Sequence, residues 1–122
     1  MRKSLNAFFV VFVLSVFVSS VSAQNMFRKA SDFDGDGKAD FAITRNVGSL
    51  KYWWVWQSTE GLKVLQWGVS FDQRAAGDYD GDGRTDLAIW RSGAQGYYWI
   101  KGSQAGIIIF PWGTSGDAPV TY

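Results

Sequence analysis

The chain contains no histidine and no cysteine, and it has only two prolines among 122 residues. The absence of histidine excludes a Ser-His-Asp triad, a histidine general base and an imidazole metal ligand. The absence of cysteine excludes a thiolate nucleophile, a disulfide and a zinc finger. Lys and Arg number 12 against 11 Asp and Glu, so the charge gives no reason to expect nucleic-acid binding. The 14 glycines and 7 tryptophans favour β structure in a single small domain.

The first 23 residues have the features of a secretory signal peptide. Arg2 and Lys3 precede an apolar run over residues 7–18, and Val21-Ser22-Ala23 has the small-x-small character of a cleavage site. We therefore expect cleavage before Gln24. The alternative is an uncleaved membrane anchor, but the apolar run has 12 residues and a membrane-spanning helix needs about 20.

An exported chain is expected outside the cell or at the cell surface, and the periplasm is the alternative compartment. Removing residues 1–23 removes two positive charges and no acid, which takes the net charge from +1 to −1. A small domain without disulfides commonly needs a metal or a partner chain for stability. We therefore expect this domain to be stabilised by a bound metal or by association with another chain.

One structural unit is written twice. The stretch from Asp32 to Ile43, DFDGDGKADFAI, recurs 46 residues later as DYDGDGRTDLAI, from Asp78 to Ile89. Further along the offset is 45, and the matched pairs are Tyr52 and Tyr97, Trp54 and Trp99, Ser58 and Ser103, Trp67 and Trp112, and Asp72 and Asp117. We place a repeat region at 24–122, with repeat 1 at about 28–72, repeat 2 at about 73–117 and the start of a third at 118–122.

Each unit is predicted to form four short strands, because segments rich in aromatic and β-branched residues alternate with Gly, Asn and Ser turns. The expected strands are 41–45, 52–56 and 62–67 in repeat 1 and 87–91, 97–101 and 107–112 in repeat 2, with a further strand before each Asp-rich stretch at 28–30, 74–76 and 119–121. Four strands in about 45 residues match one β-propeller blade. The predicted fold is all-β, with two tandem four-stranded propeller-type blades and the first strand of a third.

A propeller needs at least about four blades, and isolated blades leave apolar sheet faces uncovered. We therefore expect either a fragment of a longer repeat protein or a homo-oligomer that closes the ring.

The repeated Asp-x-Asp-Gly-Asp-Gly-x-x-Asp loop predicts a metal site. Four carboxylates within nine residues repel one another, and a hard divalent cation relieves that repulsion. Calcium fits best, because it accepts six to eight oxygens in irregular geometry. The glycines permit a sharp turn on which positions 1, 3 and 5 converge, while position 7 offers a backbone carbonyl and position 9 closes the cage. The two expected Ca²⁺ sites are Asp32, Asp34, Asp36, Lys38 and Asp40, and Asp78, Asp80, Asp82, Arg84 and Asp86.

The loops have two other interpretations. An EF-hand is excluded because position 12 is Ile43 or Ile89 instead of a bidentate Glu, and because no helix is expected to follow. An acidic Asx turn without metal is the remaining alternative, and a second aligned copy makes it weaker.

The loops and their flanking strands resemble the FG-GAP/VCBS repeat family, whose members include integrin α-subunit β-propellers. The resemblance covers about residues 28–122. Trp112-Gly113 followed by 116–119 is similar to the stretch that names the family, whereas Gln73-Arg74 departs from it. The resemblance implies that the loop lies in a β-hairpin and binds calcium through positions 1, 3, 5, 7 and 9. It also implies a non-catalytic binding or adhesion role toward a protein or glycan.

The aromatic strand 52–56 has two interpretations. Alternation places Tyr52, Trp54 and Trp56 on one face and Trp53 on the other. Trp54 has a counterpart in repeat 2 and is expected to pack between blades. Trp53 and Trp56 have no Trp counterpart, and if exposed they would form a stacking surface for a sugar. The alternative function is therefore a carbohydrate-binding, lectin-like module or an accessory module of a secreted carbohydrate-active enzyme.

Catalysis by the chain itself is not expected. The only glutamate, Glu60, lies in a predicted turn, and most aspartates are assigned to metal. Arg45 and Arg91 are expected to form ion pairs or to stack on Trp. Asp72 and Asp117 are expected to form turns.

Overall fold

The computed structural model describes residues 31–120, which form seven strands and contain no helix. The all-β prediction is therefore confirmed for this part of the chain. Within it, no helix is long and apolar enough to cross a membrane. The predicted signal peptide and the expected strand at 28–30 lie outside the described residues.

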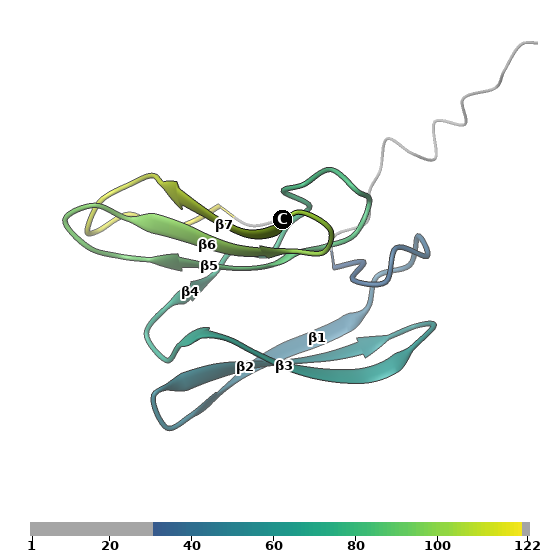
Figure 1. Ribbon diagram of the computed structural model, residues 1–122. Coiled ribbons are helices and arrows are strands. Elements are labelled where there is room, and N and C mark those ends of the chain that lie inside the picture. Colours follow the sequence, from purple (N-terminus) through teal and green to yellow (C-terminus); the bar gives the residue numbers. More distant parts are fainter. Residues whose placement is uncertain (1–30, 121–122) are drawn as a thin grey trace, which may run out of the picture.

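The strands form two antiparallel sheets, stacked one above the other in Figure 1. Sheet A is a three-stranded meander of β1 (Phe41–Val47), β2 (Leu50–Gln57) and β3 (Gly61–Val69). Sheet B is a four-stranded meander of β4 (Gln73–Arg74), β5 (Leu87–Arg91), β6 (Tyr97–Gly102) and β7 (Gly106–Pro111). The two sheets do not close on each other.

Sheet B matches the expected four-stranded unit, although β4 begins one residue before the predicted segment 74–76 and ends at Arg74. Sheet A has three strands among the described residues, and the segment expected as its fourth lies outside them. Residues 118–120 are not in a strand, so the described part of the predicted third unit forms no element. Pro119 has no N–H to donate to a ladder, which disfavours a strand there.

Alternation along β2 follows the prediction. Trp53 and Val55 are buried on one face, while Trp56 on the other face is 59% exposed. Trp53 is not available as the sugar-stacking surface considered for it: only 3% of it is accessible, and its indole Nε1–H donates to the Trp67 carbonyl at 3.0 Å. Both faces of β2 carry apolar side chains. Alternation therefore predicts which residues share a face, but it does not predict which face packs against sheet B.

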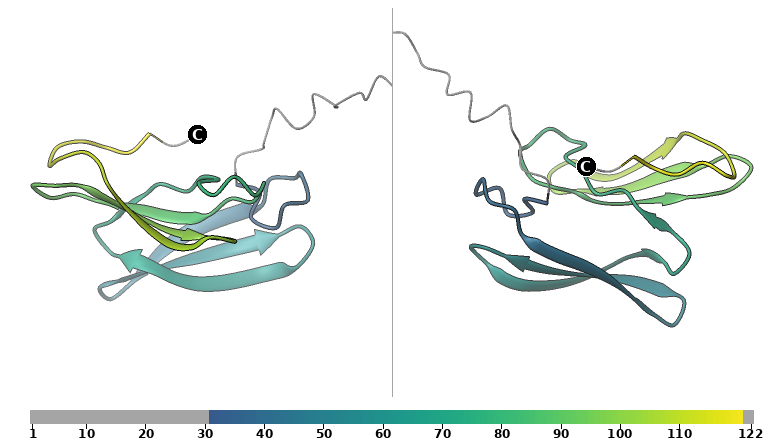
Figure 2. Two further views of the ribbon diagram at one scale, coloured as in Figure 1. Left: turned by 45° about the horizontal axis from the view of Figure 1, so that its top comes forward. Right: turned by 180° about the vertical axis from the view of Figure 1, so that it is seen from behind.

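The main core lies between the sheets, where Trp53 and Val55 of sheet A meet Leu87 and Ile89 of sheet B. Trp99 packs against this core between the two sheets. Its counterpart Trp54 lies on the opposite face of sheet A, so the packing predicted for it is absent among the described residues. The contact between the sheets, which Figure 2 shows stacked from two further sides, therefore covers this aromatic position in sheet B only.

Candidate metal centre

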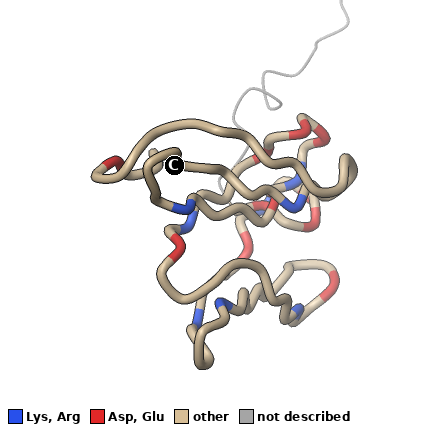
Figure 3. Tube along the Cα trace, turned by 60° about the vertical axis from the view of Figure 1, so that its left-hand side comes forward, with Lys and Arg blue, Asp and Glu red and all other residues tan. Residues whose placement is uncertain are grey.

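Two acidic loops precede β1 and β5 and lie against each other at one end of the sheets. The first covers residues 32–40 and the second covers residues 78–86. The Thr85 N–H donates to the Asp32 carbonyl at 2.6 Å, which joins the two loops. Eight of the 11 acidic residues of the chain belong to these loops, whose red segments are visible in Figure 3. Negative charge is therefore concentrated at this end of the molecule.

The first aspartate of each loop holds the turn closed. The carboxylate of Asp32 accepts the N–H groups of Gly35 at 2.8 Å and Gly37 at 2.9 Å. Both glycines have positive φ, +79° and +85°, a conformation that side chains disfavour. Asp78 accepts the equivalent N–H groups of Gly81 and Gly83 at 2.8 and 3.0 Å. The same residue pattern thus produces the same curled loop twice.

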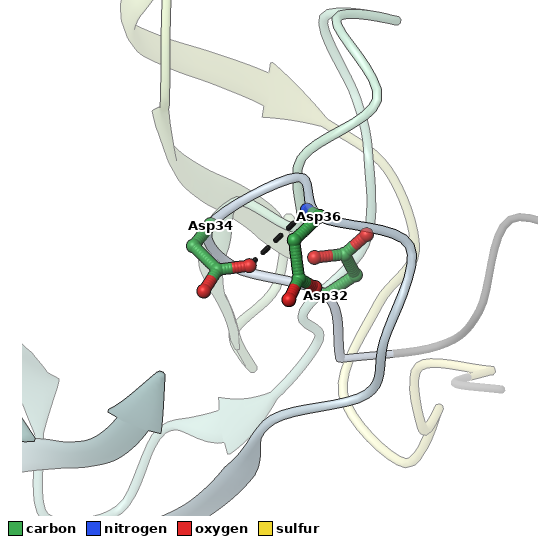
Figure 4. Close-up of side chains that lie close together, drawn as sticks. All are labelled: Asp32, Asp34 and Asp36. Atoms are coloured by element: carbon green, nitrogen blue, oxygen red, sulfur yellow. Dashed lines mark hydrogen bonds between the residues drawn. The ribbon is translucent and has the colours of Figure 1, made fainter. Parts of the chain in front are cut away.

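Each loop brings three carboxylates together. One oxygen from each of Asp32, Asp34 and Asp36 lies within 4.8 Å of the others, and Figure 4 shows these side chains gathered around the turn. In the second loop the corresponding group is Asp78, Asp80 and Asp86. Ligand oxygens at about 2.3–2.6 Å from Ca²⁺ stand at most about 5 Å apart, so both clusters have dimensions that a calcium ion can bridge.

The ninth position of each loop serves the fold as well. Asp40 is buried, and its two oxygens accept the N–H groups of Phe33 at 2.8 Å and Ser58 at 2.9 Å. It lies outside the first carboxylate cluster. Asp86 belongs to the second cluster but also accepts N–H groups from Tyr79 and Ser103. These aspartates therefore fasten the acidic loop to a hairpin turn of the same repeat.

The remaining predicted ligands lie at the rim. Asp82 is outside the second cluster and accepts the Arg84 N–H at 2.8 Å and the Ser103 hydroxyl. The Lys38 N–H donates to Asp36 at 2.8 Å. Both Lys38 and Arg84 are exposed.

Sequence reasoning did not assign a site role to the β2–β3 and β6–β7 turns. The Ser58 hydroxyl donates to Asp34 and Asp36, and both the N–H and the hydroxyl of Thr59 donate to Asp34. In the second repeat, the N–H groups of Gln104 and Ala105 donate to Asp80, at 3.0 and 3.1 Å. The match between Ser58 and Ser103 could have predicted these contacts, because a hydroxyl at the same turn position in both repeats indicates the same role in each.

These contacts keep the third-position carboxylates ionised. Desolvation opposes ionisation of Asp34, but hydrogen bonds from Thr59 and Asp36 outweigh it and hold the pKa of Asp34 below its usual range. For Asp80, the hydrogen bond from the Gln104 N–H is the main cause of a lowered pKa. Each loop therefore offers a carboxylate that is charged at neutral pH, which is the form that binds a cation.

Comparison of the chain with family models, with curated proteins and with solved structures gives no match. The resemblance to FG-GAP/VCBS repeats therefore stays a prediction that rests on the loop motif and its repetition.

Proposed function

We propose that this chain is a secreted calcium-binding repeat module with a non-catalytic binding or adhesion role. The observation that carries the proposal is the repeated carboxylate cluster: Asp32, Asp34 and Asp36 in one loop, and Asp78, Asp80 and Asp86 in the other, each spanning at most 4.8 Å. Carboxylate oxygens are the donors that Ca²⁺ prefers, and the set contains no nitrogen or sulfur ligand.

A cation in these loops would act as a structural cross-link. Asp34 and Asp80 already contact the β2–β3 and β6–β7 turns of their own repeats. Neutralising the clustered charge would remove the repulsion that opposes this closed arrangement. The residues would thereby hold loop and hairpin together, and the sheets would present a rigid surface to a partner.

The propeller-type interpretation belongs to the same proposal. Two stacked antiparallel sheets, with an acidic loop directly before β1 in one and before β5 in the other, are consistent with blades of an FG-GAP/VCBS propeller. Family members of this kind act as adhesion modules or as accessory parts of secreted enzymes, so fold alone does not decide the role. Turnover of a substrate by the purified chain would contradict the non-catalytic assignment.

Calcium titration tests the metal sites. Thermal unfolding of the exported, purified chain should shift upward between chelator and millimolar calcium. At ten times the dissociation constant each site adds about 1.4 kcal/mol, and 1 kcal/mol moves the midpoint by about 4–8 °C in a domain of this size. The double variant Asp34→Asn/Asp80→Asn should lose the shift, while Glu60→Gln, outside both loops, should keep it. An unchanged midpoint in saturating calcium would refute the proposal.

Carbohydrate binding is a second candidate, supported by one observation. Trp56 is 59% exposed and lies beside Phe41, 83% exposed, and Leu62, 49% exposed, on adjacent strands. An exposed indole face can stack on a sugar ring. A glycan array probed with the intact chain and with Trp56→Ala tests this, with Phe110→Ala as the control on sheet B. Absence of any bound glycan would eliminate this candidate.

A further inference from the structure

The contact between the two sheets joins two different faces. Sheet A contributes the face that carries Trp53, Val55 and Trp67, and sheet B contributes the face that carries Leu87 and Ile89. The sequence repeat relates each face to its counterpart on the other sheet. The outer face of sheet A carries Phe41 and Ile43, which match Leu87 and Ile89 at an offset of 46. The outer face of sheet B carries Tyr98, Ile100 and Trp112, which match Trp53, Val55 and Trp67 at an offset of 45.

Both outer faces carry exposed apolar side chains, although Ile100 and Trp90 on the outer face of sheet B are themselves buried in a second cluster. Phe41 and Ile43 are 83% and 53% exposed, whereas Leu87 and Ile89 are 5% and 1% exposed. Trp112 is 67% exposed and lines an open hollow of about 570 Å³ with Ile100, Phe110 and others. The outer faces lie on opposite sides of the molecule, as the two layers of Figure 1 show. The outer face of sheet A is therefore equivalent to the face that sheet B contributes to the internal contact. The outer face of sheet B is equivalent to the face that sheet A contributes.

An ion pair at the internal contact also has equivalents in the repeat, and these equivalents are not paired with each other. Asp72, in the turn after β3, binds Arg91 of sheet B through both carboxylate oxygens, at 2.7 and 2.8 Å. The equivalent Asp117 forms the same turn, in which the Thr114 N–H donates to its carboxylate at 2.8 Å. The equivalent Arg45 lies 4.8 Å from the Trp54 ring centre, as Arg91 lies 5.3 Å from that of Trp99. Among residues 31–120, neither Asp117 nor Arg45 has an ion-pair partner.

A hydrogen bond across the contact repeats this relationship. The Trp67 indole N–H donates to the Trp99 carbonyl of sheet B at 2.9 Å. Trp112 is its counterpart on the outer face of sheet B, and Trp54 is the counterpart of Trp99 on the outer face of sheet A. The outer faces thus repeat the residues that form the internal contact. They carry the equivalent apolar side chains, the two members of the ion pair and the indole donor, in the same relative positions.

We propose that copies of this chain associate head to tail, with the outer face of sheet B on the outer face of sheet A of the next copy, in the arrangement of the internal contact. Asp117 then pairs with Arg45 of the next copy, and Trp112 covers Trp54. Such a heterologous contact leaves one free face at each end, so it generates a closed ring or an open series. Lys101 is the sequence counterpart of Trp56, and it remains exposed beside the internal contact. Trp56 therefore lies at the rim of the proposed contact between copies.

Sedimentation velocity of the exported, purified chain over a wide concentration range tests the association. The proposal predicts a discrete oligomer or a concentration-dependent series. A chain that stays monomeric at the highest concentration, in chelator and in calcium, would overturn it. Because the inference rests on the stacking of the sheets and not on metal binding, the calcium titration and this measurement can fail separately.

Charge variants identify the contact. Asp117→Lys should weaken association about tenfold or more, because two cations then face each other. Glu60→Lys makes the same change of charge at an exposed turn and should leave association intact. Arg45→Glu provides a second single variant that leaves the Thr114 turn alone. The double variant Arg45→Glu/Asp117→Lys should restore association, and failure of the swap in a chain with native circular dichroism would refute the pairing.

Discussion

Asp72 and Arg91 connect the two sheets through a bidentate ion pair. Nε of Arg91 lies 2.7 Å from Oδ1 of Asp72 and Nη2 lies 2.8 Å from Oδ2, and the Asp72 side chain is fully buried. Arg91 donates both hydrogen bonds to the Asp72 carboxylate, and these bonds are the main cause of a raised pKa for the Arg91 guanidinium. Arg91 also lies 5.3 Å from the Trp99 ring centre, which adds a cation–π contact.

Arg91→Met should therefore destabilise the fold by about 2–3 kcal/mol, because it leaves a buried carboxylate without its cation. Arg45→Met is the matched control: Arg45 stacks on Trp54 in the same way but has no carboxylate partner among residues 31–120. Its loss should be under about 1 kcal/mol. Urea unfolding at a concentration where the chain is dilute measures both. Equal losses for the two variants would contradict a structural role for the Asp72 pair.

Asp86→Asn separates the clamp function of the ninth loop position from metal binding. Asp86 is 1% exposed and accepts N–H groups from both Tyr79 and Ser103, and an amide NH₂ cannot accept one of these bonds. We expect a loss of about 2–3 kcal/mol in urea unfolding even with chelator present.

Asp36→Asn is the control for this variant. Asp36 is exposed and belongs to a carboxylate cluster, so its change should cost under about 0.5 kcal/mol in chelator and appear only as weaker calcium binding. If Asp86→Asn were neutral in chelator, the clamp role would be wrong.

Local pattern predicted the strands well, because each depends on a short run of residues bounded by turns. The segment 87–91 is found as β5 with the same bounds, and the repeat offset placed both acidic loops. Burial was harder to predict, as Trp53 shows: it depends on which sheet face meets the other sheet. The second role of Asp86 also escaped prediction, because its partner Ser103 is 17 residues away in another turn.

Cleavage of the predicted signal peptide can be checked directly. The apolar run over residues 7–18 followed by Val21-Ser22-Ala23 predicts that the exported chain begins at Gln24. Intact-mass measurement of the chain recovered from the medium or periplasm should give the mass of residues 24–122. Ala23→Lys should block this processing, because signal peptidase requires a small residue there, whereas Ser20→Thr should not. A recovered chain that retains residues 1–23 would favour the uncleaved anchor.

Gly96 is buried where β6 approaches the residue that follows β7. Its N–H donates to the Gly113 carbonyl at 2.8 Å and its carbonyl accepts the Trp112 N–H at 2.9 Å. A Cβ at this position would lie 2.5 Å from Cζ2 of Trp90 and 2.8 Å from the Trp112 carbonyl oxygen. Trp90 is only 2% exposed, so its ring has little room to move.

Gly96→Ala should consequently cost about 2–3 kcal/mol through overpacking against Trp90. Gly93→Ala is a suitable control in the same connection between β5 and β6, since its nearest contact would be the Gln95 carbonyl oxygen at 3.1 Å. We expect that variant to lose under about 1 kcal/mol. Urea unfolding followed by tryptophan fluorescence compares the two, and it also reports directly on the Trp90 environment. A Gly96→Ala chain as stable as Gly93→Ala would mean that the outer face of sheet B yields easily, and a face that yields easily would be poorly suited to rigid stacking on a second copy.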